Sequence, residues 1–439
     1  MRIAYSNRIL RHHSMAYWIL YLFSIVSLWS CVSEKKELTF KGVAYKASLS
    51  DSIVYMGVNK ERVEPINLID GLKEVHKDTE QKVKRLLDLV DEISFFIPET
   101  TASSIIGVVS KVIRTDDRVY VLDNEKSKAL FVFDQSGKFI KGIGHAGIGP
   151  GEFVEPTDFE IDEAEGVVYI YDQYQSFVNR YDMDGRYLGR FRLLFRSKGL
   201  VEIGDEFVFQ NLLGNDHIEA IKKSALTVTD TSGLPTQVGL SMLRYNFVSD
   251  CLVRINDEVV HHMIPYNDTI YHITPNGFFA RYAFVFPESN RLPKDFVKRA
   301  GPIYEKFRER FPSNRYTYYE NGCWETDSHV MATLNHEDAY CTVLYSKEDR
   351  SSLVVPRILD SDDFCMKSLA LLLNKPVSGY KDHFIIPVYM PIFWENLDPV
   401  FSNMSEDEKK EWVTEYPELN DWSQEDNPLI CFLRFKSND

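Results

Sequence analysis

The sequence predicts an all-β protein: a β-propeller with six four-stranded blades, helical insertions and an N-terminal lipoprotein signal peptide. Three observations lead to this prediction. The first half of the chain contains a repeat of 48 or 49 residues, weaker copies of the same strand-turn element follow it, and a basic and apolar N-terminus ends at Cys31. With 439 residues, 44% of them hydrophobic, the chain has enough apolar material for a large core.

The repeat is clearest between residues 117–140 and residues 165–188. Each copy reads as an alternating strand, a loop, a second alternating strand, a D-x-x-G turn and a third strand. The aligned positions are Val119, Tyr120, Val121, Asp123, Asp134 and Gly137 in the first copy, and Val168, Tyr169, Ile170, Asp172, Asp182 and Gly185 in the second. An Asp that bonds its own turn and a Gly that accepts positive φ are typical of a hairpin. A period of about 40–50 residues with four short strands indicates a propeller blade.

Further strand-turn elements occur at residues 226–233 and 269–277, and more strands are expected near 330–345 and 383–389. The span from 95 to 435 is long enough for about seven repeats. Two helical insertions, about 293–312 and 391–417, reduce this number to six, and seven stays open as an alternative. We expect the last strand, after Asn427-Pro428, to close the ring beside residues 93–97.

This gives three parts: a signal peptide over 1–30, a lipid-anchored tether and N-terminal arm over 31–92, and the propeller over 93–436. Within the arm, residues 72–90 are expected to form a helix or an irregular segment on the propeller rim.

The N-terminus predicts export. Arg2, Arg8 and Arg11 precede an apolar run over residues 16–28, whose length fits the apolar part of a signal peptide and is short for a membrane span. Leu28-Trp29-Ser30-Cys31 resembles the lipobox of bacterial lipoproteins, although Trp29 stands where a small or β-branched residue is usual. Lipidation of Cys31 would anchor the protein to the outer membrane, facing either the periplasm or the exterior. The alternatives are an uncleaved signal anchor and a plain secretory signal.

At this point the chain resembles a known family, the six-bladed β-propeller lipoproteins common in Bacteroidota, which are related to NHL-repeat propellers. The resemblance rests on 96–100 leading to 104–107, on 116–123, on 131–137, on 147–153 and on the strand after Asn427-Pro428. Residues 290–425 match it poorly. The resemblance implies the fold and no common activity.

Composition and motifs exclude several functions. The formal charge of −15 repels phosphate backbones, and no basic cluster interleaves with aromatic residues, so nucleic acid is not an expected partner. Residues 142–147 spell G-x-G-x-x-G, but Ile148-Gly149-Pro150-Gly151 follows and cannot start a stable helix. This stretch is interpreted as a connection between blades, and no cofactor is expected. The cysteines form no C-x-x-C pair and have no histidine at ligand spacing, so no metal is expected.

Candidate site residues are few. His145 lies in the glycine-rich loop, and His261 and His262 form an adjacent pair that would line a channel or a loop site. Neighbours on a strand point to opposite faces, so we expect one of the pair to be buried and the other solvated. No catalytic motif such as G-x-S-x-G is present. The sequence therefore favours a non-catalytic module that binds a ligand, an envelope protein or a glycan. The alternative is a lyase or hydrolase acting on glycans or peptides, with residues that converge at the central channel.

Overall fold

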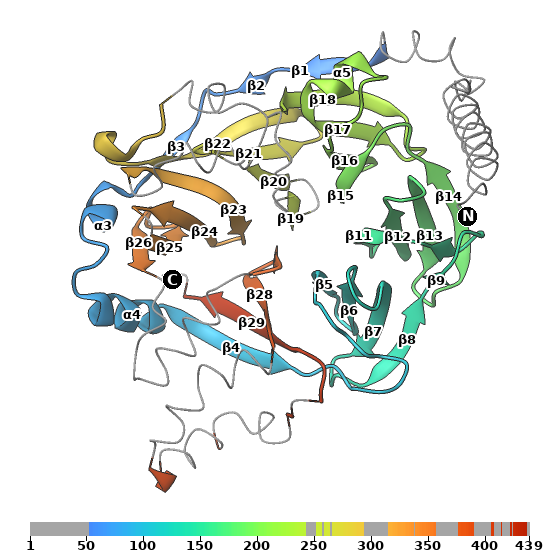
Figure 1. Cartoon of the computed structure of the whole chain (residues 1–439), viewed down its shortest axis with the longest axis horizontal. Helices are drawn as coiled ribbons and strands as arrows, with labels where there is room; N and C mark the ends of the chain where they lie inside the picture. The colour runs from blue at the N-terminus through green and yellow to red at the C-terminus, as the bar shows by residue number, and fades with distance from the viewer. Residues whose placement is uncertain are drawn as a thin grey trace, which may run out of the picture. The chain divides into compact units, whose positions relative to one another are not determined.

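The structure is a computed structural model that describes residues 52–242, 252–256, 259–263, 266–293, 315–337, 339–356, 376–389, 405–407, 414, 422–423 and 425–436. Six sheets stand around a central axis as the blades of a propeller (Figure 1). Each blade has four antiparallel strands that follow one another outward from the axis. The predicted fold class and the choice of six blades over seven are therefore confirmed.

The blades are numbered in chain order. Blade 1 contains β5 (Lys111–Arg114), β6 (Arg118–Asp123), β7 (Ala129–Asp134) and β8 (Phe139–Ile143). Blade 2 contains β11 (Pro156–Asp162), β12 (Val167–Asp172), β13 (Phe177–Asp182) and β14 (Tyr187–Arg192). Blade 3 contains β15 (Ser197–Ile203), β16 (Glu206–Asn211), β17 (Ser224–Asp230) and β18 (Pro235–Ser241), with the short helix α5 (Glu219–Lys222) before β17.

Blade 4 contains β19 (Leu252–Asn256), β20 (Val259–Met263), β21 (Thr269–Thr274) and β22 (Gly277–Val285), and a 3-10 turn, η1 (Glu288–Asn290), follows it. Blade 5 contains β23 (Thr317–Glu325), β24 (His329–His336), β25 (Ala339–Ser346) and β26 (Ser352–Pro356). Blade 6 contains β27 (Ser378–Tyr380), β28 (His383–Val388), β29 (Leu429–Phe435) and β4 (Val90–Phe96). The innermost strands β5, β11, β15, β19, β23 and β27 surround the axis (Figure 1).

Blade 6 is built from both ends of the propeller. The C-terminal β29 pairs antiparallel with the N-terminal β4, which places Cys431 opposite Phe95 and Leu433 opposite Ile93. β4 thus covers the outer edge of β29 and completes the last blade, as the expected ring closure requires. Asn427 reinforces the junction, since its side-chain amide donates to the carbonyl of Ser104 at 2.7 Å and its Oδ1 accepts from the Ile106 amide at 2.8 Å.

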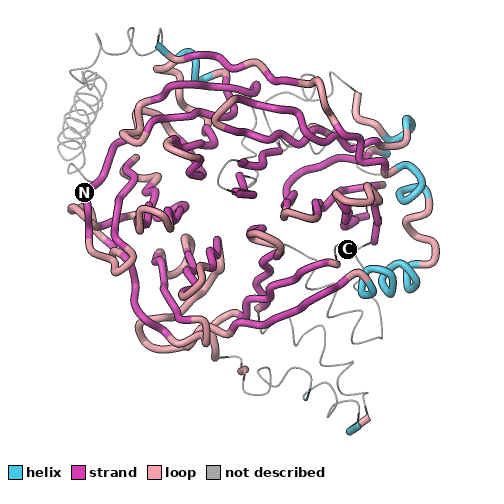
Figure 2. The backbone as a smooth tube through the Cα atoms, turned by 180° about the vertical axis from the view of Figure 1, so that it is seen from behind, coloured by secondary structure: helices cyan, strands magenta, loops and turns pink. Residues whose placement is uncertain are grey.

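The segment before β4 follows the rim. β1 (Val54–Met56) lies parallel to β18, while β2 (Val58–Asn59) and β3 (Glu64–Asn67) lie parallel to β22. Two helices then follow, α3 (Ile69–Lys73) and α4 (Thr79–Asp88), which pack on β26 at the outside of the ring (Figure 2). The predicted packing of residues 72–90 on the rim is confirmed. The buried side chains of Val83 and Leu86 attach α4 to the apolar cluster between blades 5 and 6.

The core is divided among the faces between blades. Apolar clusters join blade 1 to blade 2, blade 3 to blade 4, blade 4 to blade 5, blade 5 to blade 6 and blade 6 to blade 1. Between blades 2 and 3, Tyr169 stands edge-on to Phe207, and Tyr171 stands edge-on to Phe209. Cys323, Cys341 and Cys431 are buried thiols within this core, as expected for small apolar strand residues.

The repeated aspartates hold the turns. In the D-x-x-G turns of blades 1, 2 and 3, Oδ1 of Asp134, Asp182 and Asp230 accepts the amides two and four residues later. Asp123 accepts amides from its own turn and also from Gly107 and Val108, the segment that enters blade 1. These bonds explain why aspartate recurs at the same positions of the repeat.

Two sequence predictions lie largely outside the described residues. The proposed insertions at 293–312 and 391–417 contain few described positions, among which Glu406, Asp407 and Thr414 are helical. The proposed signal peptide and Cys31 are not among the described residues either. Within the described part, no helix is long and apolar enough to cross a membrane.

Candidate functional site

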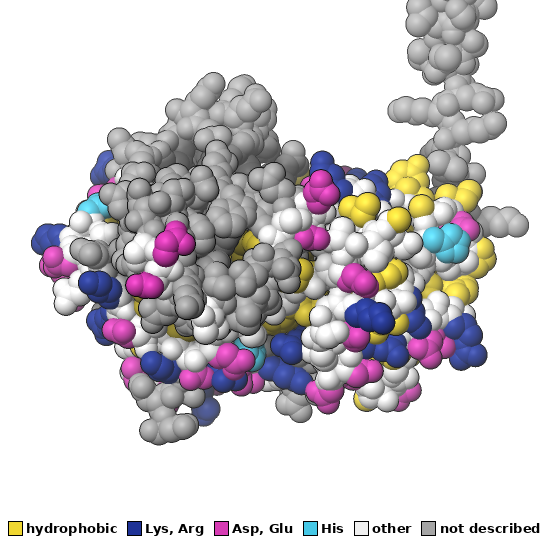
Figure 3. Space-filling model, turned by 90° about the horizontal axis from the view of Figure 1, so that it is seen from below, with side chains coloured by type: hydrophobic (Ala, Val, Ile, Leu, Met, Phe, Trp, Pro, Cys, Tyr) yellow, Lys and Arg dark blue, Asp and Glu magenta, His cyan; other side chains and the backbone are white. Residues whose placement is uncertain are grey.

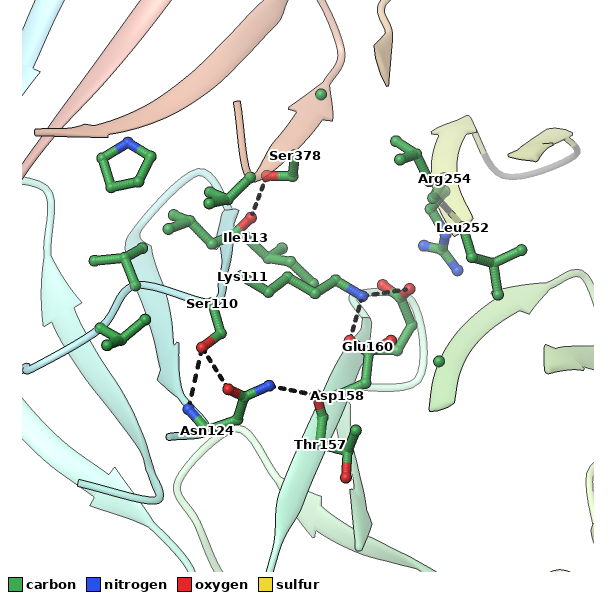
Figure 4. Close-up of a pocket in the computed structure, with 18 of the residues that line it drawn as sticks. Ser110, Lys111, Ile113, Asn124, Thr157, Asp158, Glu160, Leu252, Arg254 and Ser378 are labelled. Carbon is green, nitrogen blue, oxygen red and sulfur yellow. Dashed lines mark hydrogen bonds and ion pairs between the residues drawn. The ribbon is translucent and has the colours of Figure 1, made fainter. Parts of the chain in front are cut away.

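A pocket of about 790 Å³ lies on the propeller axis. The first strands of blades 1, 2, 3, 4 and 6 contribute to it, together with the end of β28. Its volume falls in the range of small-molecule sites, which is about 300–1,000 Å³. Apolar side chains such as Val112, Ile113 and Ile386 form part of its wall, and charged side chains project from β5, β11 and β19 (Figure 4).

Lys111 on β5 reaches across to the neighbouring blade. Its Nζ lies 2.9 Å from Oδ1 of Asp158 and 3.7 Å from Oε2 of Glu160, both on β11 (Figure 4). The second oxygen of Asp158 accepts the Leu200 amide of blade 3 at 2.8 Å. Burial lowers the pKa of Lys111, but the charges of Asp158 and Glu160 outweigh it, so the pKa is raised and the ammonium form is favoured.

Asp158 is therefore fully engaged, whereas Glu160 is not. Burial raises the pKa of Asp158, and the nearby Lys111 opposes this effect. Glu160 is only 3% exposed, and its Oε1 accepts the adjacent Ile161 amide at 3.2 Å. Its Oε2 is buried and has no hydrogen-bond partner, because the Lys111 ammonium is too distant for a hydrogen bond.

Arg254 on β19 forms the second charged group of the pocket. Its guanidinium donates to the Glu202 carbonyl of β15 at 3.0 and 3.3 Å and to Oε2 of Glu202 at 3.3 Å. Burial, followed by the negative charges of Asp162 and Glu160, raises the pKa of Glu202 to about 8 despite Arg254. A pKa of about 8 leaves Glu202 mostly protonated at neutral pH, mainly because it is buried and in addition because Asp162 and Glu160 are near.

The neutral polar side chains of the wall are oriented by hydrogen bonds. The Ser110 hydroxyl donates to Oδ1 of Asn124 at 2.8 Å, and the Asn124 amide group donates to the Thr157 carbonyl at 3.1 Å (Figure 4). The Ser378 hydroxyl donates to the Val112 carbonyl at 3.2 Å. Neither serine is paired with a base that would activate it as a nucleophile.

The three predicted histidines lie apart from this pocket. His145, in β9 (His145–Ala146), is exposed, and its Nε2 lies 3.2 Å from Oε1 of Glu152 next to β10 (Glu152–Phe153). The structure therefore places His145 in a connection between blades 1 and 2, and it does not bring it near His261 or His262.

The expectation that one of His261 and His262 is solvated is wrong, because both are buried. They do point to opposite faces of β20, but this strand is internal to blade 4 and blades cover both of its faces. His261 lies on the same face as Met263, toward blade 5, while His262 lies on the face of Val260, toward blade 3.

His261 belongs to a buried ionic cluster between blades 4 and 5. Oε2 of Glu325 lies 2.9 Å from Nδ1 of His261 and 2.9 Å from Nε2 of His272, and its Oε1 lies 2.6 Å from Nζ of Lys347. Despite complete burial, these partners hold the pKa of Glu325 well below its ordinary value. Burial lowers the pKa of His261. Among the described residues, no three His, Cys, Asp or Glu side chains are placed to hold a metal ion.

Outside the pocket, the surface carries charges of both signs. On the side drawn in Figure 3, acidic and basic side chains are interspersed over the described part. Exposed apolar side chains include Ile148, which is 76% exposed, and Tyr174, which is 72% exposed, in blade 2 and the loop that leads to it.

The residues that line the pocket were missed in the sequence. Lys111, Glu160 and Arg254, together with Glu202 beside the pocket, lie in the first strands of their repeats, where alternation alone makes them look solvent-exposed. A signal was nevertheless available: in three successive repeats, the first strand carries a charged residue between two apolar ones, namely Glu160, Glu202 and Arg254.

The fold and its axial pocket define the class of protein: a six-bladed propeller with a charged central cavity. The chain belongs to the family described as Domain of unknown function (DUF4934), whose model matches residues 72–434. No curated protein matches the sequence.

Solved structures resemble the chain to different degrees. An exported protein of Bacteroides fragilis, so named in its structure, is 18% identical with a TM-score of 0.64 over 80% of this chain and 96% of that one. A member of the DUF4221 family from Bacteroides vulgatus is 8% identical with a TM-score of 0.45 over 80% of this chain and 98% of that one. BamB from Moraxella catarrhalis is 7% identical, with a TM-score of 0.29 over 60% of this chain and 63% of that one. At these identities the first likeness shows the fold alone.

Proposed function

We propose that this protein is a lipid-anchored binding module of the cell envelope that holds a ligand in its axial pocket without transforming it. The observation that carries the proposal is the pocket itself, where Lys111, Glu160 and Arg254 from three blades converge on a cavity of small-molecule size. Propellers place such cavities on rigid strands, which favours a preorganised binding site.

The chemistry of the wall supports binding over catalysis. The charged side chains of the wall are held by partners: Lys111 pairs with Asp158, and Arg254 donates to the carbonyl and the side chain of Glu202. Among the described wall residues, no serine or cysteine nucleophile faces a histidine or another base. The enzymatic alternative, a lyase or hydrolase, would require acid-base chemistry from the carboxylates, the lysines or Tyr389 of the lining.

Export and anchoring are supported by the N-terminal pattern and by the name of the similar Bacteroides fragilis protein. In the host, metabolic labelling with an alkyne fatty acid should modify the wild-type protein and not Cys31→Ala. Equal labelling of both forms, or none, would contradict the anchor.

The pocket is tested with an extract of bacterial envelopes. Purified wild-type protein is incubated with the extract and washed, and the retained small molecules are identified by mass spectrometry. Leu252→Trp fills the pocket, while Leu188→Trp adds the same side chain on the exposed face of β14 as a matched control. We expect a molecule retained by the wild type and by Leu188→Trp but not by Leu252→Trp.

A retained molecule of unchanged mass supports binding, whereas a product of altered mass favours the enzyme. Equal retention by all three proteins would show that the pocket is not the site.

A further inference from the structure

We infer that the axial pocket recognises an alkylammonium group, with Glu160 as its receptor and the apolar wall as the seat of the attached chain. This inference rests on the proposed function and names the chemistry of its ligand. An amine of this kind is found on a lysine-like side chain, a polyamine or an amino lipid, and these share one recognition chemistry.

The first argument is the spare acceptor on Glu160. Its Oε2 lies in the pocket wall, is buried and lacks a hydrogen-bond partner. A buried carboxylate oxygen without a donor is destabilising, so such atoms are rare unless a ligand or an ordered water satisfies them. The missing partner must be a donor, because a carboxylate oxygen only accepts.

The second argument is that the cations of the pocket are occupied. Lys111 is bound to Asp158 at 2.9 Å, and Arg254 donates to the carbonyl and the side chain of Glu202. Lys198, the third cation of the lining, is not free either. A ligand anion would have to displace the partner of one of these cations, whereas a ligand cation would supply the donor that Oε2 of Glu160 lacks.

The third argument is the charge beside the site. Burial is the main cause of the raised pKa of Glu202, and the negative charges of Asp162 and Glu160 raise it further against the opposing Arg254. An ammonium group bound to Glu160 would oppose that field. It would lower the pKa of Glu202 from about 8 and release a proton on binding when the pH is near 8.

The fourth argument is the apolar wall, which selects an amine that carries a chain. Leu252 and Val253 from blade 4 and Ile386 and Val388 from blade 6 line the same cavity. Burial of methylene groups against this wall is favourable, so a six-carbon chain gives a weak but measurable interaction.

The test uses hexylammonium chloride as the probe, with hexanol and hexanoate as controls for the chain and the charge. Calorimetry on the wild-type protein should show hexylammonium binding at least about tenfold more tightly than either control. Glu160→Gln keeps the shape and removes the charge, and it should reduce hexylammonium affinity about tenfold. Glu165→Gln, at an exposed carboxylate that does not line the pocket, should leave it close to wild type.

Repeating the titration at pH 8 in two buffers of different ionisation enthalpy measures the released proton. A release in wild type that is absent in Glu202→Gln would support the inference, whereas no net release would contradict the link to Glu202.

Tighter binding of hexanoate than of hexylammonium would overturn the inference, as would unchanged hexylammonium affinity in Glu160→Gln. Neither result would refute the proposed function. That proposal fails separately, when Leu252→Trp retains the same envelope molecules as the wild type.

Discussion

At the residue scale, two carboxylates have opposite environments. Glu325 is buried with two histidines and a lysine that together stabilise its charge, while Glu202 is held beside other acids and has its pKa raised to about 8. The first carboxylate joins blades 4 and 5, and the second borders the pocket. Both carboxylates are buried, so the opposite directions of their pKa shifts come from the side chains around them.

Glu325→Ala is expected to lower the free energy of unfolding by about 3–5 kcal/mol, because it leaves His261, His272 and Lys347 without their shared partner. Urea unfolding at pH 7 measures this loss. Asp184→Ala, which removes an exposed carboxylate near Arg118 and Lys141, should cost under about 1 kcal/mol.

The folded pKa of Glu325 lies below its unfolded value of 4.5, so its stabilisation is present above pH 4.5 and is lost as the pH falls toward the folded pKa. The difference in the free energy of unfolding between wild type and Glu325→Ala should therefore become smaller in acid. A free-energy difference that is small at pH 7, or that becomes larger in acid, would contradict this account.

Residues also mark the limit of sequence reasoning. The turn aspartates Asp134 and Asp182 could be recognised because their partners lie within four positions. Glu160 could not be assigned to a pocket, since its surroundings come from strands 49 to 94 positions away, such as Lys111 and Arg254. The histidine pair was misjudged for a related reason: alternation gives the direction of a side chain but not what covers that face.

At the element scale, the outer turns hold neighbouring blades together. Gly137 in the D-x-x-G turn of blade 1 has φ +89, and an added Cβ would lie 2.2 Å from the carbonyl oxygen of Ile97, just after β4. The Glu99 amide also donates to the Gly137 carbonyl at 2.7 Å. The same motif recurs in blades 2 and 3, which is why local sequence predicted these hairpins. β1 to β3 were not predicted, since they add parallel strands to distant edges and leave no repeat.

Gly137→Ala should lower the thermal unfolding midpoint well below that of Gly166→Ala. Both glycines have positive φ, which alone penalises alanine by about 1–2 kcal/mol, but an added Cβ at Gly166 would meet nothing closer than Met183 Cγ at 3.9 Å. The steric conflict with Ile97 is thus the difference between the two variants. Differential scanning calorimetry measures both, and equal midpoints would refute the predicted role of this contact.

At the scale of the whole molecule, stability depends on closing a ring. Each described blade packs on two neighbours, so there is no terminal blade that could fray without exposing an apolar face. The repeat and the flanking strands together made this architecture predictable. The axial pocket was not, because it exists only when first strands from distant repeats meet.

Removal of β29 by ending the chain after Asn427 should abolish a cooperative thermal transition, because β4 would lose the strand it pairs with and β28 would keep only β27. Ending the chain after Lys436 retains β29 and the hydrogen bond from the Lys436 amide to the Leu89 carbonyl, and should leave the transition unchanged. Circular dichroism during heating separates the two results. A sharp transition in the shorter chain would show that the ring is not closed cooperatively.

The pairing of β4 with β29 also determines how late in synthesis blade 6 can be completed. Arg434 donates to Asp91, 343 positions earlier in the chain, and synthesis runs from the N-terminus. While a nascent chain emerges, β4 has no partner strand until β29, more than 330 residues later, has been made. Protecting such an edge from pairing with other chains during this delay is a task for chaperones. We therefore expect folding of the newly made chain to be more sensitive to crowding and heat than the folded propeller is.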